Sequence, residues 1–214
     1  MVIRCCTLSH RVYLAADDPD GAIEQIKHAL GQWSQARYDC PHLGTAFSIV
    51  ECELYAGRID QARKYLLGEW AALKSSLLSR KCQTFRIMFY YMRARTALAI
   101  WLQRRDDRAM LREIERYVSL LRNARAIWGV ALGDALQSSV EAGRGHVKEA
   151  MLLLDRAEKT LRQEDFRLLA EAVSRRCGEL EGEAGSDRIE AANRFMRSEN
   201  IARPDRITYM ILPG

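Results

Sequence analysis

Apolar residues recur at three- and four-residue steps along nearly the whole chain, which is the spacing of one face of an α-helix. No segment sustains the period of two that a half-buried strand requires, and the 214 residues include only 13 glycines and 4 prolines. Together these features predict long helices and an all-α protein. The main helices are predicted over residues 19–33, 41–57, 65–77, 85–102, 107–121, 128–142, 147–161, 166–180 and 187–196.

A longer repeat accompanies this pattern. Gly57 is followed five residues later by Ala62, and Gly145 is followed five residues later by Ala150. In each case we expect the glycine to lie in the turn of a helix pair. The alanine would then begin the second helix, where a small residue permits a close crossing. The alanines at matching places in the other pairs are Ala22, Ala109 and Ala191.

These alanines are 40 to 47 residues apart, a period typical of helical repeats whose helix pairs bury their apolar faces by stacking. We therefore predict a right-handed solenoid of about five antiparallel helix pairs, tetratricopeptide-like but with longer helices. Residues 1–198 would form this repeat domain. Residues 199–214 would form a tail with a short capping helix from Pro204 that covers the last pair. An irregular helical bundle is the alternative.

The segment from Phe195-Met196-Arg197 through Pro204-Asp205-Arg206 to Leu212-Pro213-Gly214 resembles the C-terminus of large bacterial regulators. Those proteins join a Ser/Thr kinase domain or a nucleotide-binding ATPase domain to a long tetratricopeptide-like array. The resemblance implies the terminal helical region of a signalling regulator, or a free-standing relative. Its partner would be a kinase or ATPase domain in the same or a neighbouring chain. The chain has no G-x-x-x-x-G-K-[ST], H-R-D or D-F-G motif, so neither catalytic activity carries over.

The composition and the apolar segments indicate where in the cell we expect the protein. The first residues lack the apolar run of a secretory signal, and the most apolar segment, residues 87–102, is interrupted by Arg93 and Arg95. Six cysteines are scattered without a C-x-x-C pair, so we expect reduced thiols rather than a disulfide framework. The 27 arginines against 6 lysines are typical of a GC-rich bacterial genome. We therefore expect a bacterial cytoplasmic protein with no membrane partner.

No residue pattern predicts catalysis. None of the four histidines lies in a motif with a nucleophile or paired carboxylates. Asp17-Asp18 and Asp106-Asp107 precede predicted helices, where carboxylates favour the positive end of the helix dipole. Cys6 and His10 are four residues apart, but a closed zinc site needs four ligands. We expect a non-enzymatic protein with no metal and no cofactor.

Positive charge is concentrated in residues 80–125, which carry a net charge of +8 while the remainder of the chain carries −3. Like charges at helical spacing cost an isolated helix about a few tenths of a kcal/mol each. The stripe is either a solvated face, with Glu115 and neighbouring helices supplying counter-charge, or a docking site for an acidic protein segment or nucleic acid. The four residues of this arginine stripe are Arg105, Arg108, Arg112 and Arg116.

The predicted function is that of a non-catalytic interaction or regulatory scaffold, which binds a peptide, a partner domain or an effector on the concave face of the solenoid. Tyr90, Tyr91 and Arg93 are the candidate anchors if they face the groove. Nucleic-acid binding by the arginine stripe is a weaker alternative, because the net charge of +5 is modest and no basic tail is present. A further alternative is a small-ligand-sensing domain whose curvature responds to an effector.

Overall fold

The computed structural model describes residues 9–33, 38–76 and 82–214. Within these ranges the chain is helical and contains no strand, so the all-α prediction is confirmed. No helix among them combines the length and the apolarity that crossing a bilayer requires. The elements are α2 (His10–Ala15), α3 (Pro19–Gly31), α4 (Cys40–Tyr55), α5 (Ile59–Ser75), α7 (Gln83–Gln103), α8 (Arg108–Arg122), α9 (Ile127–Gly143), α10 (Val147–Gln163), α11 (Arg167–Glu181), the 3₁₀ turn η1 (Gly182–Gly185), α12 (Ser186–Ser198) and α13 (Pro204–Ile211).

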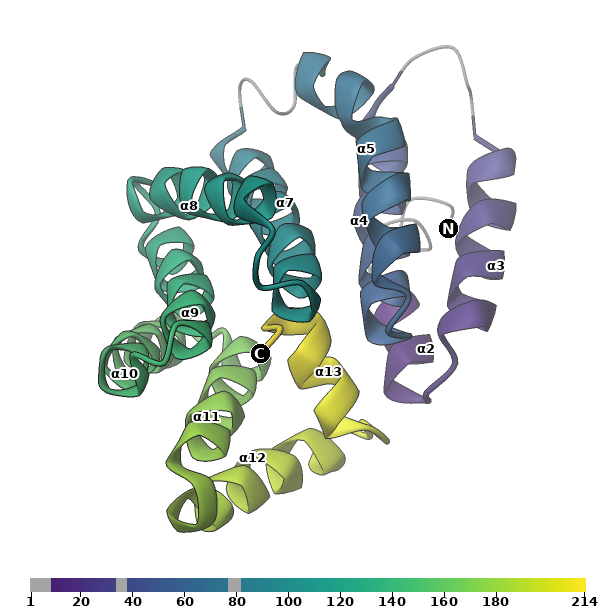
Figure 1. Ribbon diagram of the computed structural model, residues 1–214. Helices are drawn as coiled ribbons and strands as arrows, with labels where there is room; N and C mark the ends of the chain where they lie inside the picture. Colours follow the sequence, from purple (N-terminus) through teal and green to yellow (C-terminus); the bar gives the residue numbers. More distant parts are fainter. Residues whose placement is uncertain (1–8, 34–37, 77–81) are drawn as a thin grey trace.

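Each helix packs against the next one along the chain. In Figure 1 the helices follow one another around a curve, from α3 and α4 through α7 and α9 to α11 and α12, with α13 inside the curve. Most residues of α4, α7 and α9 are buried, because these helices have neighbours on several sides. α5, α8 and α10 instead bury one apolar stripe and expose their other faces.

A single turn geometry connects several of these helices. Gly57 and Gly145 have φ angles of 74° and 88°. The residue after each glycine donates its backbone N–H to the carbonyl of the residue five positions before it. This is the Schellman arrangement, in which a residue of positive φ ends a helix. Asp17 and Asp165 form the same turn with φ angles of 62° and 58°. The glycine in the predicted repeat therefore marks a turn that aspartate forms elsewhere in the chain.

A buried alanine follows each of these four turns by five residues. A small side chain at this point lets the new helix approach its neighbour closely. The alanines without exposed surface are Ala22, Ala62, Ala150 and Ala170.

The alanine positions predicted for the other two pairs are wrong, since Ala109 and Ala191 are exposed. The connection from α7 to α8 contains no residue of positive φ, so it is not the Schellman turn of the repeat. The 3₁₀ turn η1 precedes α12, and the buried alanine there is Ala192, one residue later than predicted.

Two glycines let α11 and the start of α12 come into backbone contact. A Cβ added at Gly185 would lie 2.0 Å from the carbonyl oxygen of Gly178. We predict that Gly185→Ala lowers the free energy of unfolding by about 1–3 kcal/mol, because backbone must move to make room. Urea unfolding followed by circular dichroism measures this change. The matched control is Gly68→Ala in α5, where a Cβ meets no atom within 4 Å.

Gly68→Ala is expected to raise the same free energy by about 0.5–1 kcal/mol, because alanine loses less backbone entropy than glycine in a helix. A destabilisation of similar size at both positions would contradict the close contact between Gly178 and Gly185.

The C-terminal segment joins distant parts of the chain. The predicted capping helix forms as α13 and contacts α11 and α12, but it also packs against α4. The Ala202 N–H donates to the Ala15 carbonyl at 2.8 Å, and Arg206 donates to the Asp17 carboxylate at 2.9 Å. Residues 201–214 therefore do more than cover the last pair, because they connect it with α2 and α4 near the other end of the curve.

Candidate functional site

A cavity of about 1130 Å³ lies inside the curve. Its walls come from α2, α4, α7 and α9, from the start of α11, and from the C-terminal segment that includes α13. Ligand sites in proteins are typically concave, largely apolar and about 300–1,000 Å³ in volume. The cavity is therefore large enough to hold a small organic molecule.

One wall of the cavity is apolar. It is formed by side chains of α9, α11 and α13, which bring together parts of the chain far apart in sequence. At its edge the rings of Trp128 and Phe166 pack with their centroids 5.6 Å apart. Phe166 and, on α2, Val12 are large apolar side chains that stay exposed although both line the cavity. The main apolar lining residues of this wall are Trp128, Leu132, Leu169, Ile207, Met210 and Ile211.

Another part of the lining carries charge. Glu51 of α4 accepts a hydrogen bond from His10 Nε2 at 2.8 Å and one from Arg95 Nη2 at 3.2 Å. Arg11 of α2 lies 3.7 Å from the same carboxylate. The Arg95 guanidinium stacks over the Tyr91 ring, 4.5 Å from its centroid. Glu51, Arg11, Arg95 and Tyr91 all line the cavity, and we call them, with His10, the charged cluster.

Burial sets the electrostatics of the charged cluster. Glu51, His10 and Arg95 are buried, and Arg95 has no exposed surface. Burial alone would raise the pKa of Glu51, but the charge of Arg11, the hydrogen bond from His10 and the charge of Arg95 hold the pKa well below its ordinary value. Within the described part of the chain, Nε and Nη1 of Arg95 donate to no acceptor. The cluster therefore contains buried N–H donors that have no acceptor among the described residues.

The structure separates the three predicted anchor residues. Tyr91 lines the cavity, and its hydroxyl donates to the carbonyl of Ile211 in the C-terminal segment. Arg93 is buried against Glu113 of α8, with 2.6 Å between Arg93 Nη2 and Glu113 Oε1, and it stacks on Trp70 of α5. Tyr90 packs on Tyr117 of α8. Only Tyr91 is therefore brought to the cavity, while Tyr90 and Arg93 join α7 to α8.

The arginine stripe lies on an exposed face of α8 and the turn before it. Arg105 donates to the Gly143 carbonyl, and Arg116 lies over the Tyr117 ring. In the described ranges Arg108 and Arg112 form no ion pair. Glu115, the expected source of counter-charge, pairs instead with Arg144, at 2.7 Å between Arg144 Nη2 and Glu115 Oε1. Two arginines of the stripe thus keep their charge free for solvent or a partner.

Apart from Tyr91, the charged cluster was not among the site residues predicted from sequence. Its signal is present nonetheless, because Arg95 interrupts a helix that is otherwise apolar nearly all round, and Glu51 does the same in α4. A charge in such a helix has no exposed face to occupy, so it must find a buried partner. The sequence does not say which two helices are neighbours, and the pair was therefore missed.

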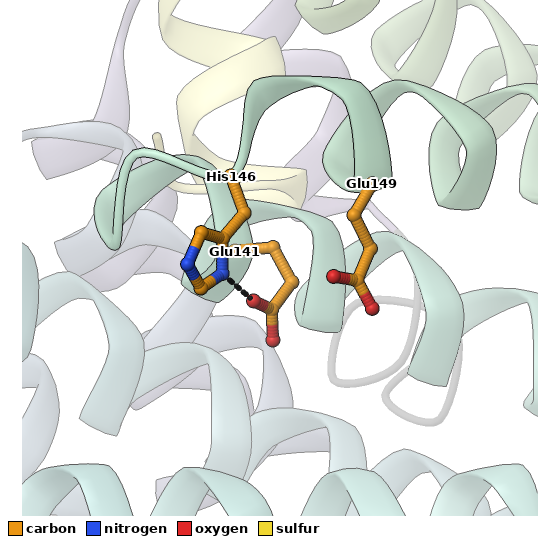
Figure 2. A group of neighbouring side chains, drawn as sticks. All are labelled: Glu141, His146 and Glu149. Carbon is orange, nitrogen blue, oxygen red and sulfur yellow. Dashed lines mark hydrogen bonds and ion pairs between the residues drawn. The ribbon is translucent and has the colours of Figure 1, made fainter.

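A second cluster, whose residues do not line the cavity, has the composition of a metal site. Figure 2 shows Glu141 at the end of α9, and His146 and Glu149 at the start of α10. Their ligand atoms lie within 4.8 Å of one another. The Glu141 carboxylate already accepts from His146 at 2.8 Å and from Gln137 at 2.6 Å, and Arg144 pairs with it. These contacts within the protein account for the cluster: its side chains form polar interactions that stabilise the turn between α9 and α10.

The described cysteines contribute no ligand set. Cys40, Cys52, Cys82 and Cys177 are free thiols, and burial raises the pKa of Cys177 to about 12, so this thiol is unreactive. Cys6 lies outside the described residues, and its proposed partner His10 is bound to Glu51.

Comparison with known proteins finds no match for this chain. No protein-family model matches the chain, and neither a curated protein nor a solved structure matches it significantly. The function must therefore be argued from the cavity and the surfaces themselves.

Proposed function

We propose that this chain is a non-catalytic regulatory module that binds a small effector in its internal cavity. The observation that carries the proposal is the cavity of about 1130 Å³, whose lining combines an apolar wall with the charged cluster. α13 occupies the inside of the curve, where a bound peptide or partner domain would otherwise lie. The geometry thus favours a small ligand over a peptide or a partner domain on an open concave face.

The architecture that we propose is a tetratricopeptide-like right-handed solenoid, in which the C-terminal segment crosses the concave side. Consecutive packing of the helices and the recurring Schellman turn followed by a buried alanine support it. The resemblance of residues 195–214 to bacterial kinase and ATPase regulators supports a regulatory role in the cytoplasm. A kinase or ATPase domain, in the same or a neighbouring chain, is the proposed partner.

The position of the cavity gives effector binding a way to act on the whole molecule. α2 and α4 come from one end of the curve, whereas α11 and the segment carrying Asn200 come from the other, and all of them line the cavity. A ligand that contacts both ends favours the curvature in which those contacts form. A partner that binds only one curvature would then respond to the ligand.

A cavity-filling variant tests this function. Met88 of α7 is half-buried in the cavity wall, and Met151 of α10 is half-buried away from the cavity. In a thermal-shift screen against a metabolite panel, we expect a ligand at 100 times its Kd to raise Tm by about 5–10 °C. Met88→Trp should reduce that shift, because the larger indole takes part of the space and changes the shape of the wall. Met151→Trp, the matched control, should keep it.

Two results would contradict the proposed function. One is a panel in which no compound raises Tm of the unmodified chain. The other is a ligand whose shift survives both Met88→Trp and Arg11→Gln unchanged, because that ligand does not contact the cavity lining.

The unpaired Arg108 and Arg112 support one alternative function, the binding of nucleic acid or an acidic protein segment on α8. Phosphate contacts make nucleic-acid affinity fall steeply with salt. Titration against duplex and single-stranded DNA at two salt concentrations tests this alternative, and binding that ignores salt eliminates it.

A further inference from the structure

We propose that the effector is an anionic amphiphile, with a carboxylate or phosphate head beside Arg95 and Arg11 and an apolar body along the apolar wall. This inference rests on the proposed function, because it assumes that the cavity is a ligand site. It adds the chemical class of the ligand and the residues that recognise it.

The first argument is charge balance in the charged cluster. Two guanidinium groups, those of Arg11 and Arg95, face the single carboxylate of Glu51. Glu51 and Arg95 form a buried ion pair, and the half-exposed Arg11 adds a positive charge that no second carboxylate of the cluster balances. This part of the lining therefore attracts an anion in the cavity more than a cation.

The second argument is hydrogen-bond capacity. Arg95 uses Nη2 for Glu51 and for the sulfur of Met92, and its Nε and Nη1 donate to no described acceptor. A guanidinium binds the oxygens of carboxylate or phosphate through two parallel N–H groups, which neutral head groups cannot match. The buried donors therefore point to an acceptor with more than one oxygen.

The other charged residues that line the cavity are Asp165, Arg167 and Glu199, and all three are exposed. Asp165 and Arg167 lie at its edge, are largely exposed and pair with each other at 3.4 Å. Glu51 is already occupied by His10 and Arg95. A cationic ligand would consequently find no free buried carboxylate among the described lining residues.

The apolar wall defines the rest of the ligand. Leu132, Met210 and Ile211 are buried there, and Trp128 with Phe166 extends the apolar surface to the edge of the cavity. An alkyl or aromatic body laid along these side chains would be removed from water, which is the main source of affinity for an apolar group. A ligand that consisted of a head group alone would make no contact with this apolar wall.

Isothermal titration calorimetry with the full chain tests the inference. The probes are decanoate, decyl phosphate and 1-decanol, at pH 8 and below micelle-forming concentrations. They share one alkyl chain and differ in the head group. We expect at least one anion to bind ten or more times more tightly than 1-decanol. The comparison of decanoate with decyl phosphate identifies the preferred head.

Two arginine variants locate the head group. Arg11→Gln changes a half-exposed side chain at the cavity, so it is expected to fold and to weaken the preferred anion at least fivefold. Arg95→Gln should weaken the anion further, and circular dichroism verifies that it folds. Affinity for 1-decanol should not change in either variant. The matched control Arg108→Gln, on the exposed face of α8, should bind all probes like the unmodified chain.

Equal affinity for decanoate, decyl phosphate and 1-decanol would overturn the inference, and so would anion binding that Arg11→Gln leaves unchanged. These failures are distinguishable from failure of the proposed function. If 1-decanol binds equally well and Met88→Trp weakens its binding, the cavity is a ligand site with no preference for anions. If no probe and no panel compound binds, both proposals are wrong.

Discussion

Replacing Glu51 with glutamine is expected to lower the free energy of unfolding by about 3–5 kcal/mol, because it leaves a buried arginine without its counter-charge. Arg95 has no exposed surface, and within the described chain Glu51 is its only ion-pair partner. Urea unfolding followed by circular dichroism gives the free energy of both proteins.

Glu115→Gln is the matched control for this variant. Glu115 pairs with Arg144 at the surface, where both side chains are solvated, so its loss should cost less than about 1 kcal/mol. A double variant isolates the pair, since Glu51→Leu with Arg95→Met removes both charges and should recover most of the stability. A Glu51→Gln variant as stable as Glu115→Gln would show that the cluster is hydrated in solution.

The same variant has a pH signature. The pKa of Glu51 is lower in the folded protein than its ordinary value of 4.5. Its contribution to stability is consequently complete above about pH 4.5 and is lost as the pH falls below that value toward the folded pKa. The unmodified chain should therefore lose more stability between pH 5 and pH 3 than Glu51→Gln does, measured by urea midpoints across this range.

The positions of the helices could be predicted because their causes are local. Residues 85–102 are apolar at helical spacing, and α7 extends over Gln83–Gln103. Pro204 suits the first turn of a helix, and α13 begins there. The Schellman turns at Asp17 and Asp165 escaped prediction because aspartate adopts positive φ less readily than glycine, so its sequence carries no comparable signal.

The candidate site depends on contacts that sequence spacing does not encode. Tyr91 and Ile211 are 120 positions apart, yet the tyrosine hydroxyl binds the isoleucine carbonyl. A short amphipathic helix after a helical array predicts a cap on its last pair, which is the nearest apolar surface in sequence. The inside of a curved array offers a larger apolar surface, and α13 lies there, in contact with α4 as well as with α11 and α12. The cavity is what remains between α13 and the inner helices.

A chain that ends at Asn200 is expected to lose cooperative folding. The missing segment buries five large apolar side chains, each worth about 1.5–3 kcal/mol, and their sum approaches the total stability of an ordinary domain. Tyr91 and Arg176 would also lose their acceptors, because Arg176 donates to the carbonyls of Leu212 and Gly214 at 2.7 Å. The five buried side chains are Ile201, Ile207, Met210, Ile211 and Leu212.

Thermal unfolding followed by circular dichroism tests the truncated chain. A milder variant shows whether a loss of signal comes from lower stability or from aggregation of the truncated chain. Ile207→Ala removes one buried side chain of α13 and should lower the free energy of unfolding by about 2–5 kcal/mol. Its matched control is Ile127→Ala, at the start of α9, where the isoleucine is 53% exposed and the change should be within about 0.5 kcal/mol.

A truncated chain with unchanged Tm, together with an Ile207→Ala variant as stable as the control, would mean that α13 is only loosely held inside the curve. The inner face would then be open to a peptide or partner domain, and the small-effector proposal would lose its main support. A large loss in both variants instead makes the C-terminal segment part of the core. The cavity is then a permanent feature of the folded protein, and an effector must fit within it.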